Sequence, residues 1–98
     1  MNISDWRRRI DEIDKKLVKL LNERSQCALE IGRIKQESNI PLYQPDRENE
    51  VLANAENENK GPLTDAAIRR LFERIIDEAR SAERVAMHGD PPTDEEPK

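Results

Sequence analysis

The chain has little of what strands, disulfides and most catalytic machinery require. Of its 98 residues only 3% are aromatic, and it contains one cysteine and one histidine. Because Cys27 is the single cysteine, an intrachain disulfide and a cysteine-based metal site are excluded. We expect Cys27 to be a small packing residue within a helix. The lone histidine, His88, lies at the edge of the C-terminal tail, so neither a Ser/His/Asp triad nor a Cys/His pair is expected. The sequence has no Gly-rich phosphate loop, and no cluster of histidines or cysteines that could hold a transition metal. We therefore expect neither a metal site nor a cofactor.

Long apolar runs are absent as well. None approaches the roughly 18 residues that cross a bilayer, and the first six residues have no signal-peptide core. We therefore expect a cytoplasmic protein that does not interact with membranes. The net charge of −4 argues against a general nucleic-acid binder. Residues 88–98 carry −3 of that charge, so the remainder is close to neutral and the placement of its cations matters most.

Charged residues make up 39% of the chain, which is typical of solvated helices. We expect a first helix over about residues 5–38, with Ser4 as its N-cap and the run Asn39-Ile40-Pro41 ending it. Its apolar positions alternate spacings of three and four, which predicts one continuous seam. They are Ile3, Trp6, Ile10, Ile13, Leu17, Leu20, Cys27, Ile31 and Ile34.

The length of this helix predicts a partner. A helix of about 34 residues spans roughly 50 Å. A compact globule of this chain length is only about 30–35 Å across, so the seam overhangs any core that one chain can build. A second copy is the simplest cover, because twofold dimers are the commonest assembly. We expect an intertwined helical homodimer, with a different helical partner as the alternative.

Two shorter helices complete an all-α fold of three helices. The second begins at Pro45, a residue suited to the first helical position, and ends at the run Asn59-Lys60-Gly61-Pro62. The third follows Thr64 as N-cap and carries an apolar stripe. Residues 1–88 are expected to form the helical domain. Residues 89–98, rich in proline and acid, are expected to be a disordered tail.

Arg24 breaks the seam of the first helix. It occupies the position between Leu20 and Cys27 where an apolar side chain is expected, so its guanidinium needs an anionic partner. Lys35, eleven residues on, returns to nearly the same face about 16 Å away, and the two cations can converge on one small ligand. The alternative is an ordinary buried ion pair of Arg24 with Asp14 or Glu48.

Four further residues are candidates for a binding site. Arg7 lies roughly 25 Å before Arg24 along the helix, so only antiparallel pairing of two chains brings it near the same ligand. Arg47 and Glu48 flank the buried face of the second helix and point into a cleft, unless that first turn is simply exposed. Glu83 lies on the apolar stripe of the third helix, where desolvation raises a carboxyl pKa, unless the helix end frays.

The order and spacing of several motifs resemble the all-helical (AroQ-type) chorismate mutases, and most closely the mutase domains of bifunctional prephenate dehydratases. The resemblance covers about residues 5–87, without a second domain. Its motifs are Trp6-Arg7-Arg8-Arg9-Ile10-Asp11-Glu12-Ile13-Asp14, Leu20-Leu21-Asn22-Glu23-Arg24, Ile31-Gly32-Arg33-Ile34-Lys35, Pro41-Leu42-Tyr43-Gln44-Pro45-Asp46-Arg47-Glu48 and Arg70-Leu71-Phe72-Glu73-Arg74-Ile75-Ile76.

The resemblance implies roles for the cations. Arg24, Lys35 and Arg47 would bind the two carboxylates of chorismate, and Arg7 would enter from the partner subunit. Lys35 would also donate to the ether oxygen of the breaking bond. The implied reaction, the rearrangement of chorismate to prephenate in phenylalanine and tyrosine biosynthesis, needs no proton transfer, covalent intermediate or cofactor.

The remaining roles involve Glu48, Glu83 and two departures. Glu48 would accept a hydrogen bond from the ring hydroxyl, and Glu83 would be the second donor to the ether oxygen. Gln44 stands where a family member has Asp, and Ala79 stands where many have Ser, which weakens two contacts. Two other functions stay open: a non-catalytic helical interaction module, and an isochorismate-pyruvate lyase on the same scaffold.

Overall fold

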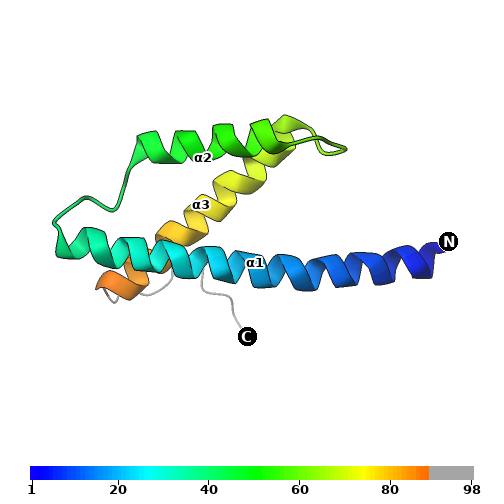
Figure 1. The fold of residues 1–98 in the computed structure, drawn as a ribbon, viewed down its shortest axis with the longest axis horizontal. Helices are drawn as coiled ribbons and strands as arrows, with labels where there is room; N and C mark the ends of the chain where they lie inside the picture. The colour runs from blue at the N-terminus through cyan, green and yellow to red at the C-terminus, as the bar shows by residue number, and fades with distance from the viewer. Residues whose placement is uncertain (89–98) are drawn as a thin grey trace.

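The computed structural model describes residues 1–88, which form three α-helices and no strand within that range. They are α1 (Ile3–Glu37), α2 (Pro45–Glu58) and α3 (Asp65–His88). In Figure 1, α3 crosses obliquely between the long rod of α1 and the shorter α2. The predicted all-helical class and the three helices are confirmed. The expectation for residues 89–98 lies outside the described residues.

The start of α1 differs from the prediction. Asn2, not Ser4, is the N-cap: its side-chain oxygen accepts from the Asp5 backbone N–H at 2.9 Å, and Asp5 accepts from the Asn2 N–H at 3.2 Å. This reciprocal capping box needs an acid three residues after the cap, which Asn2 has and Ser4 lacks. The C-terminal end is as predicted, because Asn39 has a φ of 58°, the left-handed conformation that asparagine tolerates.

The ends of α2 and α3 agree with the sequence. Pro45 is the first residue of α2, and the helix ends before Asn59. The Asn59 amide then donates to the Leu63 carbonyl and to the Asp65 carboxylate, both at 2.8 Å, which fixes the connecting loop. The Thr64 hydroxyl accepts from the Ala67 N–H at 3.1 Å and caps α3 as predicted.

Packing within one chain is concentrated on α3, which lies against both α1 and α2. The buried apolar residues are Leu52 of α2 and Ala79 of α3, together with Gly32 on α1. In contrast, the N-terminal part of α1 extends beyond the other helices (Figure 1). Its apolar seam is uncovered there, with Trp6 57% and Ile10 54% exposed. The structure therefore leaves the predicted partner-binding seam open.

Among residues 1–88, none of the three helices is both long and apolar enough to cross a membrane. The molecule measures 54 × 36 × 20 Å, and its long dimension follows α1. The cytoplasmic location stays a prediction.

We expect Thr64→Ala to lower the free energy of unfolding by about 1 kcal/mol, because the cap of α3 loses its acceptor. Urea denaturation at fixed protein concentration, followed by circular dichroism, measures this change. Thr64→Ser is the matched control and should unfold nearly as the parent protein does. Equal losses for both variants would show that the methyl group matters rather than the hydroxyl.

Candidate functional site

A cavity of about 410 Å³ opens between the three helices, within the size range of small-molecule sites. It brings together six of the seven predicted site residues: Arg24, Lys35, Gln44, Arg47, Glu48 and Glu83. The other lining residues are Cys27, Ala28, Ile31, Leu42, Val51, Ile76, Ala79 and Arg80. Every helix and the α1–α2 loop contribute to this wall.

The α1 side of the cavity carries Arg24, Cys27 and Lys35. Arg24 is half-buried, and within residues 1–88 of one chain it forms no ion pair with Asp14 or Glu48. Cys27, expected as a packing residue, is exposed at the cavity wall. The Lys35 ammonium donates to the Leu42 carbonyl at 3.3 Å and ties the loop to α1.

The α2 side carries Gln44, Arg47 and Glu48. The Gln44 amide donates to the Pro41 carbonyl at 3.4 Å, which turns the loop into the first turn of α2. Arg47 is exposed at the cavity edge and pairs with Glu50 on its own helix. Glu48 is half-buried and points toward α3, where it meets a cation that the sequence did not single out.

That cation is Arg80 of α3. One terminal guanidinium nitrogen of Arg80 donates to both carboxylate oxygens of Glu48, each at 2.7 Å. Its guanidinium carbon also lies 5.3 Å from the ring centre of Tyr43, within cation–π range. The signal was present in the spacing, because Ile76, Arg80 and Glu83 are separated by four and three residues and share one face of a helix.

Glu83 lies on α3 against the backbone of α1. A Cβ atom built on Gly32 would be 3.4 Å from Cγ of Glu83, an ordinary van der Waals contact, so the acid lies close to the backbone of α1 at this glycine. Burial raises the pKa of Glu83 above its ordinary value, as predicted; Lys35 and Arg80 act to lower it and Glu48 to raise it. Glu83 is therefore protonated more readily than a solvated glutamate.

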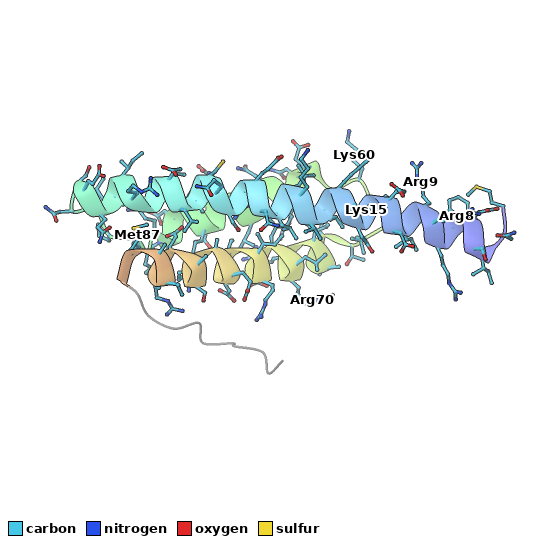
Figure 2. The ribbon with its side chains drawn as sticks, turned by 90° about the horizontal axis from the view of Figure 1, so that it is seen from below. Arg8, Arg9, Lys15, Lys60, Arg70 and Met87 are labelled. Atoms are coloured by element: carbon cyan, nitrogen blue, oxygen red, sulfur yellow. The ribbon has the colours of Figure 1, made fainter. Side chains whose placement is uncertain are left out.

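Arg7 is the predicted site residue that the cavity of this chain does not contain. It lies 17 residues before Arg24 on α1, which is about 25 Å along the helix axis. Its neighbours Arg8 and Arg9 mark that end of α1, beyond the end of α3 in Figure 2. Its role in a shared site stays a prediction.

The cavity is positively charged overall. Arg24, Lys35, Arg47 and Arg80 outnumber Glu48 and Glu83, giving +2 when both acids are ionised. The lining has no histidine, and the Cys27 thiol has no hydrogen-bonded base within residues 1–88, so the arrangement for nucleophilic catalysis is missing there. These side chains can bind a compact anion and donate hydrogen bonds to it.

A second cavity of about 510 Å³ lies between α2 and α3 and shares Arg24, Arg47 and Val51 with the first. It contains Lys60 but neither Lys35 nor Glu83. The smaller cavity is therefore the candidate site, because it holds the titratable residues from all three helices.

Comparison with known proteins identifies relatives along most of the chain. Residues 6–84 match the family described as chorismate mutase type II. A bifunctional chorismate mutase/prephenate dehydratase of Neisseria gonorrhoeae is 42% identical over 78 residues, which cover 80% of this chain and 21% of that protein. A chorismate mutase of Methanocaldococcus jannaschii is 41% identical over 46 residues, covering 47% of this chain and 46% of that one. The chain thus spans about a fifth of the bifunctional relative.

A solved structure has the same fold over nearly its whole length. Chorismate mutase (form II) of Thermus thermophilus superposes with a TM-score of 0.82 at 38% identity. The match covers 84% of this chain and 93% of that chain. Identity and coverage at this level relate the two chains by family as well as by fold.

Proposed function

This chain belongs to the chorismate mutase type II family, and we propose that it catalyses the rearrangement of chorismate to prephenate. The observation that carries the proposal is the cavity in which four cations and the half-buried Glu83 surround a space of about 410 Å³. The reaction is a unimolecular shift of bonds within one dianion. It requires restriction of the flexible enolpyruvyl arm and stabilisation of charge on the ether oxygen.

The cations bind the two carboxylates. Arg24 is suited to this because its guanidinium has no acidic partner in residues 1–88 and faces the cavity. Arg47 at the opposite wall supplies a second cation on α2. Guanidinium groups bind carboxylates through two parallel hydrogen bonds, which fixes the orientation of the substrate as well as its position.

Lys35 and Glu83 donate to the ether oxygen as negative charge develops there. Both line the cavity, where burial raises the pKa of Glu83 and the nearby Lys35 partly offsets that rise. A 10⁶-fold acceleration corresponds to about 8 kcal/mol of preferential binding of the transition state. Two charged or desolvated donors together with conformational restriction supply energies of this order.

Glu48 accepts from the ring hydroxyl of the substrate, and its carboxylate is already oriented by Arg80. Gln44 lies beside it in the lining and can also contact the hydroxyl. Ala79 is buried and offers no hydroxyl, so the contact that a serine makes in many family members is absent. Neither departure removes a cation from the cavity.

We expect Arg24→Ala to reduce kcat/KM for chorismate by at least about 100-fold, because the substrate loses its charged anchor. The measurement is the rate of chorismate loss and prephenate formation. Arg33→Ala is the matched control: Arg33 is on the same helix, is exposed and pairs with Glu30, so activity should persist.

The outcomes separate the candidate functions. Full activity of Arg24→Ala would contradict the proposed role of the cavity. A parent protein that converts isochorismate but not chorismate would be a lyase. A folded parent that converts neither substrate, and whose melting temperature chorismate does not raise, would be the non-catalytic module.

We further propose that the active protein is a homodimer whose sites contain the partner subunit's Arg7. The exposed apolar seam of α1 supports this, because an uncovered stripe of this kind is costly in water. A twofold axis that crosses α1 at Leu17 sets the partner subunit's Arg7 beside Cys27. An axis at Leu21 sets it beside Lys35. Both crossing points are apolar and exposed, so antiparallel contact in this range completes the cavity.

Mixing two inactive variants tests the shared site. Arg7→Ala and Arg24→Ala subunits should each be nearly inactive alone. After joint refolding, half of the dimers are mixed and each mixed dimer has one intact site, so about a quarter of the parent activity should return. Sedimentation velocity should show dimers for both variants. No recovery from mixed dimers would place Arg7 and Arg24 in sites of one chain.

The pKa of Glu83 predicts the pH dependence of the reaction. Protonated Glu83 donates to the ether oxygen, whereas the ionised form repels it. Because burial raises this pKa, activity should be highest below it and should fall as pH rises through a range above that of an ordinary glutamate. Glu83→Gln donates at every pH and should flatten the profile of kcat/KM. An unchanged profile in Glu83→Gln would assign the titration to another group.

A further inference from the structure

The contact between Arg80 and Glu48 lies inside the candidate site. Both residues line the cavity, and a single terminal nitrogen of Arg80 donates to both Glu48 oxygens at 2.7 Å. The guanidinium carbon of Arg80 also lies over the Tyr43 ring, 5.3 Å from its centre. The pair joins α3 to α2 across 32 residues of sequence and is half-buried.

We propose that Arg80 is a positioning residue of this site: it fixes the Glu48 carboxylate and separates its negative charge from Glu83. The inference rests on the proposed function and deepens it. It gives a role to Arg80, the fourth cation of the cavity, which acts on the two acids and not on the substrate. Glu48 and Glu83 line one cavity, and Arg80 belongs to the same helix face as Glu83.

The geometry of the pair distinguishes it from an ordinary structural bridge. Arginine usually holds a carboxylate with two nitrogens in a fork. Here one nitrogen holds both oxygens, and Nε of Arg80 is buried without an acceptor in residues 1–88. Each Glu48 oxygen keeps a further lone pair, so Glu48 can still accept a hydrogen bond from a ligand hydroxyl. The contact thus fixes the acid without saturating it.

The charges around Glu83 come from all three helices. Lys35 faces it from α1, Glu48 from α2 and Arg80 from α3, while Arg24 and Arg47 line the rest of the cavity. Arg80 and Lys35 favour the ionised form of Glu83, and Glu48 opposes it. Removal of Arg80 takes away one attraction and leaves the repulsion by Glu48, so the pKa of Glu83 should rise further.

A double-mutant cycle tests whether Arg80 acts through Glu48. Arg80→Met should lower kcat/KM for chorismate by about tenfold in the parent, and by less than about twofold in a Glu48→Gln background. Arg80→Lys, which retains the cation, should recover most of the loss. Equal losses in both backgrounds, or no rescue by lysine, would overturn the proposal.

The pH profile gives a readout that general destabilisation does not move. In Arg80→Met the fall of kcat/KM should move to higher pH, because Glu83 stays protonated to a higher pH. In Arg80→Lys the fall should occur at the same pH as in the parent. The charge-matched control is Arg84→Met. Arg84 is exposed, does not line the cavity and is not among the charges that shift Glu83, so its loss should leave the profile unchanged.

A measurement without substrate separates this inference from the proposed function. Carboxyl ¹³C NMR titration, with the Glu83 signal assigned from Glu83→Gln, should give a higher Glu83 pKa in Arg80→Met than in the parent. An unchanged pKa would overturn the inference even if chorismate is converted. If chorismate is not converted, the proposed function fails and this titration still decides the role of Arg80. Should Arg80→Met not fold, Arg80→Gln replaces it.

Discussion

The close approach of α3 to α1 at Gly32 is the constraint on which the site depends. A side chain there would meet Glu83 at ordinary contact distance, so the glycine lets the acid lie directly on the backbone of α1. Ala79, one turn earlier on α3, is small and buried. Since α3 also packs on α2, the position of this one helix sets the width of the cavity and the environment of both acids.

The arrangement of charge follows from this packing. The two acids of the cavity are placed by α2 and α3, and each faces a cation: Arg80 contacts Glu48, and Lys35 acts on Glu83. Arg24 is left without an acidic partner in residues 1–88. An arginine in that state is suited to an anionic ligand rather than to holding the fold together. The charges are therefore divided between groups that position the acids and groups that remain available to a substrate.

Local sequence patterns predicted most of the fold, and helical periodicity predicted several of the residues that line the cavity. Pro45 marks the start of α2 by its fixed backbone angle, and Thr64 marks the start of α3 by its capping hydroxyl. The start of α1 differs from the prediction because Ser4 and Asn2 are both good caps, and only Asn2 has an acid, Asp5, three residues later to complete a capping box. Arg80 was missed because it flanks the apolar stripe, and its partner Glu48 lies 32 residues away on another helix. The proposed role of Arg7 depends on a second chain, so no pattern within one chain can place it.

The cavity also differs in sign from the rest of the molecule. The chain carries −4, whereas the lining carries +2, so all other residues together carry −6. A dianion diffusing toward the protein is attracted by the lining of the cavity, whereas the rest of the chain carries a net negative charge. Such a field acts over about 8 Å at physiological ionic strength. Capture of the ligand is then guided by short-range electrostatic steering, and added salt weakens both the repulsion and the attraction.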